Sequence, residues 1–352
     1  MDFTFNDDQV LLVDSVRKFL MNEVSPELIR ELWTRPAGRS RELWSLLAAQ
    51  GLTGLSVPQE FGGMGMNDTD WVLIAQECGY HAVPEPLLDT AWVGAGLISA
   101  LPESAFRSQW LAKIADGTAR IAIAQSQSGL VPDAHLAGVI LMPYDGDLYA
   151  VSPQLAQLTL QHSVDPSRRL YSVAWKAGTA ERIANDASAA WQLACDRSAL
   201  AAAAQLLGLT QRMLDLSIDY TAQRKQFGRP IGSYQAVKHY LADVAIKLEF
   251  ARPVVYRAAD ALAHGKPHAS VHVSHAKVAA AEAALLAARN GIQVHGAMGY
   301  TWEMDLHIFM KMAWALDGAS GDRSFHLARI REFALAKDSP IGPGHTFEEQ
   351  HS

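Results

Sequence analysis

Two short segments of this 352-residue chain combine residue types that suit a negatively charged, acceptor-rich ligand. The first, residues 224–228 (RKQFG), follows a long Ala-rich stretch, so Arg224 is expected at the end of a helix. A guanidinium there can bind a pyrophosphate through two parallel hydrogen bonds. The amides of Gln226 and Gln235 can bond to a ribose or a phosphate, and Phe227 can lie against a ring. This segment is therefore a candidate nucleotide-binding element.

The second segment, residues 293–301 (QVHGAMGYT), also follows a helical stretch. Gln293 offers a side-chain amide, and Gly296 allows a ligand to approach the backbone closely because it carries no side chain. Taken alone, both segments are equally compatible with capped helix ends whose Arg and Gln side chains are solvated. The residues by themselves leave that alternative open.

The elements that would position these segments are long helices. In residues 186–338 the apolar residues recur with the period of a helix, and this pattern predicts a four-helix bundle. The first of its helices contains a single helix breaker, Gly208, and Pro253 should kink the second. The predicted helices cover residues 183–224, 234–264, 269–295 and 322–335.

The first two blocks of the chain differ from each other in period. Residues 1–112 predict a helical domain, and residues 113–185 predict a small β-domain because their apolar residues alternate. Asp145-Gly146 between two alternating runs indicates a hairpin turn. Residues 339–352 are expected to be a flexible tail. The fold class is mostly α with a small central β-domain. Expected helices include 41–50, 68–80 and 87–101, and expected strands are 120–125, 138–142, 147–152 and 170–174.

Composition excludes several classes of protein. The net charge of −7 argues against a general nucleic-acid binder, because phosphate binding requires a basic surface. Two cysteines cannot build a disulfide framework, and the histidines at 264, 268, 272 and 275 lack an acid or Cys beside them, so no metal site is expected. No secretory signal or membrane span is visible, and a cytoplasmic location is expected.

Together with residues 58–65 (PQEFGGMG), the two segments resemble three motifs of the acyl-CoA dehydrogenase family, in the same order. The resemblance implies FAD-dependent oxidation of a CH–CH bond in an acyl-CoA substrate, with a downstream flavoprotein as electron acceptor. In the family the two motifs that match residues 224–235 and 293–301 hold the ADP half of an FAD whose isoalloxazine sits in the neighbouring subunit. The resemblance therefore assigns cofactor binding across an oligomer interface to Arg224, Gln226, Phe227, Gln235, Gln293 and Gly296.

The chain departs from the family at the catalytic base. Family members use a glutamate before a glycine near the last helix, and a count without gaps from Gln293 puts Ser320 there. The alternative family position, on the first bundle helix, falls at Ser198. A hydroxyl without a partner base cannot hold the α-proton at neutral pH. Asp317, in a loop that could slip, is a possible substitute, and Glu303 is better explained as a charge at a helix start.

The central block also departs from the family. Residues 122–129 (AIAQSQSG) stand where a Thr/Ser-Glu-Pro segment is usual, no Trp-Ile-Ser/Thr segment follows, and the block is shortened. The chain therefore resembles most closely the short, degenerate subunit of heteromeric bacterial acyl-CoA dehydrogenases, which acts with a full-length partner of the same family. Two alternatives remain: a self-sufficient flavoenzyme with an unusual base, and a flavin-free scaffold on the same fold.

Overall fold

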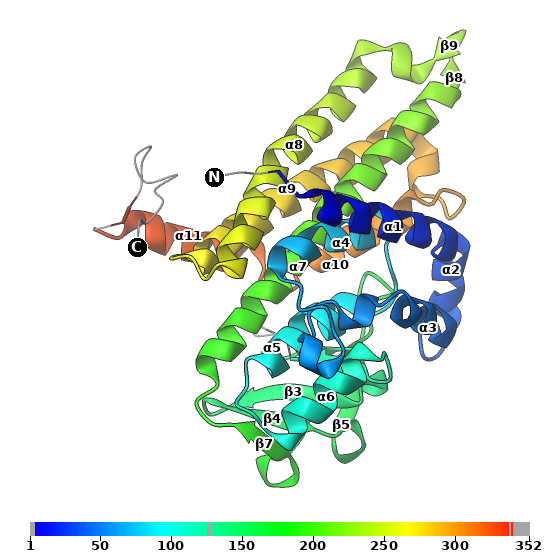
Figure 1. Ribbon diagram of the computed structural model, residues 1–352. Helices are drawn as coiled ribbons and strands as arrows, with labels where there is room; N and C mark the ends of the chain where they lie inside the picture. Colours follow the sequence, from blue (N-terminus) through cyan, green and yellow to red (C-terminus); the bar gives the residue numbers. More distant parts are fainter. Residues whose placement is uncertain (1–3, 125–127, 338, 341–352) are drawn as a thin grey trace.

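Helices make up most of the chain, and the two main β-sheets come from residues 121–184, which confirms the predicted fold class (Figure 1). The computed structural model describes residues 4–124, 128–337 and 339–340. Three of the eight residues at 122–129 that depart from the family motif, namely residues 125–127, lie outside the described residues, as does the predicted tail from residue 341 onward.

The N-terminal helices begin at residues whose side chains cap them. Asn6 accepts a hydrogen bond from the Gln9 backbone N–H at 2.8 Å, and the Gln9 side chain accepts one from the Asn6 N–H at 3.0 Å. This reciprocal pair satisfies two N–H groups that a helix start leaves free. The region contains α1 (Asp7–Glu23), α2 (Pro26–Thr34), α3 (Arg41–Ala49), η1 (Leu52–Gly54), η2 (Gln59–Phe61), α4 (Asp68–Tyr80), the π-helical η3 (Leu88–Gly94), α5 (Ala95–Ser99) and α6 (Ala105–Ala115).

The strands form two small sheets with orders β1-β3-β4-β7 and β2-β6-β5. The predicted hairpin joins β3 to β4, and Asp145 and Gly146 both have positive φ, 52° and 81°, as a two-residue hairpin turn requires. β1 pairs with β3 in parallel, and the other pairs are antiparallel. The strands are β1 (Ile121–Ile123), β2 (Val131–Pro132), β3 (Val139–Tyr144), β4 (Asp147–Val151), β5 (Gln157–Gln161), β6 (Leu170–Ala174) and β7 (Glu181–Ala184).

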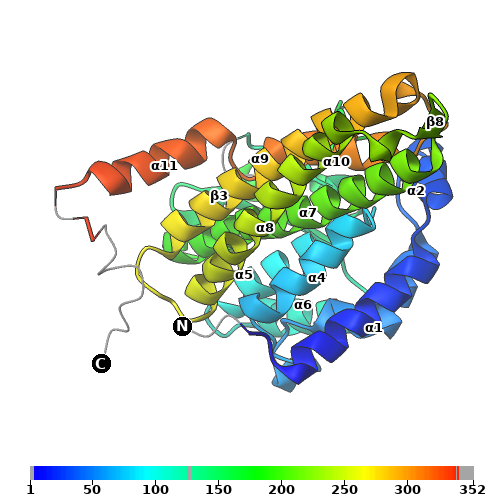
Figure 2. The same ribbon diagram turned by 90° about the horizontal axis from the view of Figure 1, so that it is seen from above.

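The bundle is built on three long helices that run side by side, with α10 packed on two of them and α11 projecting from one end (Figure 2). Their interiors are rich in buried alanine, which allows the helix axes to approach closely. The 36-residue α7 extends about 54 Å. The helices are α7 (Ser188–Gln223), α8 (Gln235–Ala263), α9 (Ala269–His295), α10 (Leu306–Asp317) and α11 (Arg323–Leu335).

α7 contains a glycine, Gly208, at the point where it crosses α4. A Cβ atom at Gly208 would lie 1.9 Å from the carbonyl oxygen of Gln76 in α4, and one at Gly79 would lie 2.0 Å from that of Gln205 in α7. The two helices therefore cross backbone to backbone, which only glycine allows at such a distance. This crossing fixes the N-terminal helices against the bundle.

Several sequence-based boundaries were wrong. The first bundle helix begins at Ser188, because residues 181–184 pair with β4 as a strand and Asp186 adopts a left-handed φ of 47°. Residues 306–317 form α10, so Asp317 ends a helix and does not lie in a loop. The helix expected at 87–101 forms without a break but is π-helical in its first part, with η3 followed directly by α5, and it ends at Ser99. No helix in the described ranges is long and apolar enough to cross a membrane.

Candidate functional site

The predicted nucleotide-binding residues gather at one end of the bundle, which we call the bundle end: residues 224–235 and 293–300 (Figure 1). α7 stops at Gln223, and Arg224 leads into a hairpin of β8 (Lys225–Gln226) and β9 (Arg229–Pro230). Its tip is formed by Phe227 and Gly228, with φ of 53° and 79°. This turn returns the chain to α8, whose first residue is Gln235.

The second segment lies beside the first. The Tyr220 ring stacks on His295 with centroids 4.3 Å apart, and the Tyr220 hydroxyl donates to the His295 carbonyl at 3.4 Å. Tyr220 precedes Arg224 by one helical turn, and His295 follows Gln293 by two residues, so the two helix ends are adjacent. Gly296 has φ 59° and ψ −137°, a conformation essentially restricted to glycine. The structure therefore brings the two predicted segments together.

The side chains at the bundle end face outward. Arg224, Gln226, Gln235 and Gln293 are exposed, and Phe227 is 91% exposed. Among the described residues, none of the four polar side chains has a hydrogen bond or ion pair. The Phe227 ring meets the Tyr234 ring edge to face, with centroids 6.4 Å apart. The bundle end thus presents an unpaired guanidinium, three amides and a flexible glycine backbone, a donor set that suits a pyrophosphate and a ribose.

The two serines that the sequence aligned with the family's base positions meet in space. Ser198, in α7, and Ser320, after α10, lie 122 residues apart in sequence, yet their Oγ atoms are 2.7 Å apart and share a hydrogen bond. Ser320 adopts a left-handed φ of 55°. The contact agrees with the gap-free count that aligned both serines with base positions. In the described part of the chain, neither hydroxyl bonds to a carboxylate or an imidazole.

Two buried basic side chains hold the loop that carries Ser320. Lys277, only 1% exposed, donates from Nζ to the carbonyls of Asp317 at 2.8 Å and Gly321 at 3.3 Å. His326 Nε2 donates to the Ser320 carbonyl at 3.1 Å, and its Nδ1 accepts from Ser274 at 3.0 Å. Burial lowers the pKa of Lys277 to about 8 and that of His326 to about 4. Sequence reasoning missed this clamp, although a lysine in an Ala-rich helix was a visible signal.

Asp317 is poorly placed to act as a base. As the last residue of α10, it has its carbonyl fixed by Lys277, and its carboxylate is close enough to Lys277 to oppose the lowering of that residue's pKa. It does not line the cavity beside Ser320. Glu303 is exposed and precedes α10.

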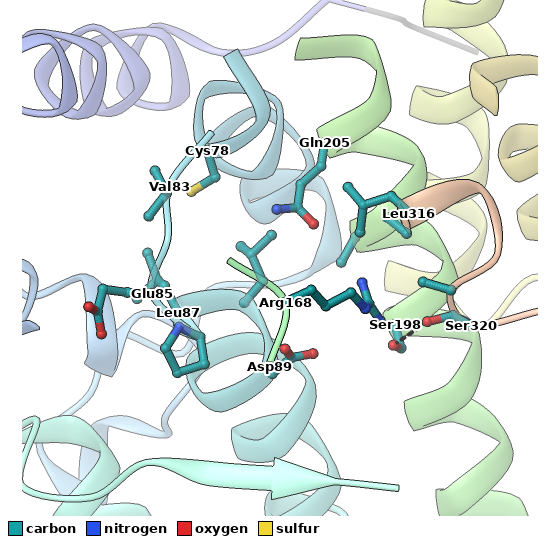
Figure 3. Close-up of a pocket in the computed structure, with 15 residues that line it drawn as sticks. Cys78, Val83, Glu85, Leu87, Asp89, Arg168, Ser198, Gln205, Leu316 and Ser320 are labelled. Atoms are coloured by element: carbon teal, nitrogen blue, oxygen red, sulfur yellow. Dashed lines mark hydrogen bonds between the residues drawn. The ribbon is translucent and has the colours of Figure 1, made fainter. Parts of the chain in front are cut away.

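The cavity beside Ser198 and Ser320, which we call the serine cavity, is small and polar. Its volume is about 60 Å³, and a second compartment of about 20 Å³ shares both serines and Asp89. Figure 3 shows Arg168 and Asp89 entering it from different elements. Burial raises the pKa of Asp89 to about 6, and Arg168 opposes that rise. Other wall residues include Cys78, Glu85, Leu87, Gln205 and Leu316.

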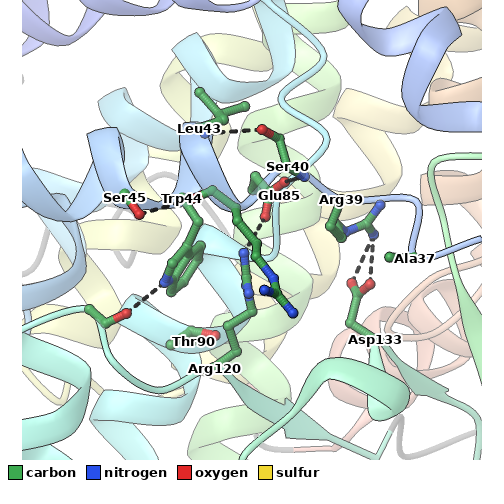
Figure 4. Close-up of polar contacts among 12 residues, drawn as sticks. Ala37, Arg39, Ser40, Leu43, Trp44, Ser45, Glu85, Thr90, Arg120 and Asp133 are labelled. Atoms are coloured by element: carbon green, nitrogen blue, oxygen red, sulfur yellow. Dashed lines mark hydrogen bonds and ion pairs between the residues drawn. The ribbon is translucent and has the colours of Figure 1, made fainter. Parts of the chain in front are cut away.

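Ion pairs beyond the cavity join the N-terminal helices to the strands (Figure 4). Glu85 accepts hydrogen bonds from the Ser40 N–H at 2.6 Å and from Arg120 at 3.0 Å, and Arg39 pairs with Asp133 at 2.9 Å. Burial raises the pKa of Glu85, while the Arg120 and Arg39 charges oppose the rise. These pairs fix the wall of the serine cavity that carries Glu85 and Asp89.

Comparison with known proteins identifies relatives over almost the whole chain. The family model described as the acyl-CoA dehydrogenase N-terminal domain matches residues 6–118, and the model of the C-terminal domain matches residues 187–335. Residues 119–186, which contain both small sheets, lie outside both matches.

Individual relatives agree with the family models. The chain is 33% identical over 308 residues to acyl-CoA dehydrogenase IpdE2 of Mycobacterium tuberculosis, covering 87% of this chain and 91% of the relative. It is similar in structure to a chain of the ChsE4–ChsE5 complex from Mycobacterium tuberculosis, with a TM-score of 0.84, 25% identity, and coverage of 96% and 100%. The Tcur3481–Tcur3483 steroid ACAD has the same fold, with a TM-score of 0.85, 24% identity, and coverage of 93% and 97%.

Proposed function

This chain belongs to the acyl-CoA dehydrogenase family of flavoprotein oxidoreductases acting on CH–CH groups, and we propose that it is a non-abstracting subunit of a heteromeric member. Its assembly carries out FAD-dependent α,β-dehydrogenation of an acyl-CoA thioester. The partner is a full-length member of the family, which supplies the base, the isoalloxazine pocket and the acyl site. A further flavoprotein accepts the electrons downstream.

In this assembly the bundle end holds the ADP half of the partner's FAD. Arg224 pairs with the pyrophosphate, and the amides of Gln226, Gln235 and Gln293 serve the phosphates and the ribose. Phe227 covers a ring, and Gly296 admits the cofactor to the backbone. The support is that these side chains face outward without partners of their own. Bound FAD accepts the two electrons that leave the acyl group.

The observation that carries the proposal is the hydrogen bond between Ser198 and Ser320. By the gap-free count, serine occupies both positions that bear the catalytic glutamate in the family, and the two hydroxyls share one hydrogen bond of 2.7 Å. Lys277 holds the loop so that Asp317 cannot move into the cavity without breaking buried hydrogen bonds. This chain therefore binds cofactor without abstracting a proton.

The relatives support the heteromeric assembly and suggest its substrate class. One similar structure is a complex of two different chains, ChsE4 and ChsE5, and another is described as a steroid ACAD. We propose a steroid-derived acyl-CoA as the substrate. We also propose a cytoplasmic location for the assembly.

Co-expression with a full-length family member from the same genome tests the proposal. We expect the two chains to co-purify in a one-to-one ratio as a yellow complex with the absorption spectrum of bound flavin. The same chain expressed alone should be colourless after gel filtration. A yellow homomeric chain that oxidises acyl-CoA unaided would contradict the proposal.

A further inference from the structure

The serine cavity is far smaller than a site for an acyl thioester. Small-molecule pockets usually enclose roughly 300–1,000 Å³, whereas this cavity measures about 60 Å³ and its second compartment about 20 Å³. A volume of this size holds only a few water molecules. Yet the cavity lies at the position where a family base would face its substrate. Something in this chain must therefore fill the remaining space.

Arg168 enters that space. It belongs to the loop between β5 and β6, and Figure 3 shows its side chain running between Asp89 and the pair Ser198 and Ser320. Burial lowers the pKa of the Arg168 guanidinium, and the nearby carboxylates of Asp89 and Asp165 oppose this effect. The charge is thus balanced by neighbouring acids, although no described acid lies within 4 Å of it.

The residues on either side of Arg168 are anchored. Ser167 accepts a hydrogen bond from the Trp33 indole at 2.6 Å, and the Arg169 guanidinium donates to the carbonyls of Trp33 at 3.3 Å and Arg35 at 3.0 Å. The Arg169 carbonyl in turn accepts from the Asp133 N–H at 2.8 Å. Because both flanks are tied to other elements, the backbone of Arg168 is fixed beside the cavity that its side chain enters.

A half-buried guanidinium beside a half-buried carboxylate also disfavours an apolar ligand. An acyl chain in the same space would displace the remaining water around Arg168 and Asp89 without replacing its hydrogen bonds. The small volume of the serine cavity and its polar lining therefore both exclude an acyl chain.

We infer that Arg168 plugs this chain's own acyl pocket, so that no thioester enters at the position of the lost base. The inference rests on the proposed function for the identity of the pocket. It has a consequence for the assembly: each pair of chains contains one acyl site, located in the partner.

Cys78 provides a reporter that is independent of flavin and of the partner, because it lines the serine cavity and is 1% exposed. The purified chain, alone or in complex, is treated with N-ethylmaleimide, and alkylation of the Cys78 peptide is followed by mass spectrometry. We expect Arg168→Ala to raise the Cys78 rate at least tenfold. Arg168→Lys, which retains the positive charge and most of the length of the side chain, should leave it within about twofold of wild type.

Equal Cys78 alkylation rates in the wild-type protein and the folded alanine variant would overturn the inference. If Arg168→Ala does not fold, Arg168→Gln takes its place and should give an intermediate rate; no increase in that variant would equally overturn it. Failure of co-purification or of flavin binding would count against the proposed function without altering the Cys78 result.

Discussion

In the part of the chain that the structure describes, polar side chains are exposed and unpaired at the bundle end, whereas in the serine cavity they hydrogen-bond within the chain. At the bundle end, Arg224 and Gln293 are exposed and have no side-chain partners among the described residues. In the serine cavity, Ser198 bonds to Ser320, and the loop behind Ser320 is held by Lys277 at 2.8 Å and 3.3 Å. Exposed polar groups without partners can bind a ligand that another chain holds. Polar groups that hydrogen-bond to one another instead stabilise the fold of this chain.

Under the proposed function, this chain keeps one half of a shared site and has lost the other half. Binding an ADP moiety requires hydrogen-bond donors, and we propose that Arg224 and the amides of the bundle end supply them. Proton abstraction requires a carboxylate beside the substrate, and both candidate positions have lost it. The family name alone would have assigned both functions to this chain.

The largest effect should come from outside this chain. Replacing the base glutamate of the full-length partner by glutamine should slow flavin reduction in the complex by roughly 10²–10⁴-fold, because general base catalysis contributes about that much. Stopped-flow absorbance measures this rate. If the complex keeps its rate of flavin reduction after this substitution, the base lies in the present chain. The contrast between the bundle end and the serine cavity would then not hold.

The next effect concerns the bundle end. Arg224→Ala removes a charge-assisted contact of roughly 1.5–3 kcal/mol, so FAD should bind about 10- to 100-fold more weakly to the assembled complex. The flavin-to-protein ratio after dialysis measures the loss. Arg331→Ala, an exposed arginine on α11, is the matched control and should retain its flavin. Equal flavin content in both variants would remove Arg224 from the site.

A smaller effect concerns the clamp behind the serine cavity. The pKa of His326 is about 4 in the folded chain against 6.5 ordinarily, because burial disfavours the charged ring. Between pH 6.5 and 4 the folded state therefore binds fewer protons at His326 than the unfolded state does. The stability that comes from burying the neutral ring is fully present above pH 6.5 and is lost as the pH falls towards 4. The loss amounts to about 3 kcal/mol at most.

Urea unfolding at several pH values measures this dependence. The wild-type free energy of unfolding should fall between pH 6.5 and 4, and His326→Gln should show a flatter profile over that range. Parallel profiles for the two proteins would show that His326 titrates normally and that the clamp is not what we describe.

The smallest effects should be seen at the base positions themselves. Ser320→Ala and Asp317→Asn should each leave turnover of the complex within about threefold, because no bond-breaking step uses them. The competing view gives Asp317 the role of base, and predicts a loss of at least about 100-fold in that variant with flavin still bound. Steady-state rates and flavin content separate the two views.

Local signals allowed the sequence to predict the bundle end. Arg224 and Gly296 mark helix ends, and such ends depend on a few neighbouring residues. The serine cavity depends on contacts between distant residues: Ser198 meets Ser320 across 122 positions, and Lys277 reaches a loop 40 residues away. The plug at Arg168 could not be predicted, because its placement depends on Trp33 and Asp133 in other elements.

Errors in the predicted elements have similar causes. Residues 181–184 have a period that fits either a helix or a strand, and pairing with β4 decides for the strand. α10 was missed because it is short and its residues are apolar on most sides, as in a buried helix.

An anaerobic titration with acyl-CoA tests the central claim most directly. The chain alone, incubated with excess FAD, and the complex with its full-length partner are each titrated while flavin absorbance is recorded. We predict that the complex bleaches one flavin per pair of chains and that the isolated chain bleaches none. Bleaching of flavin by the isolated chain, at a rate close to that of the complex, would contradict the account.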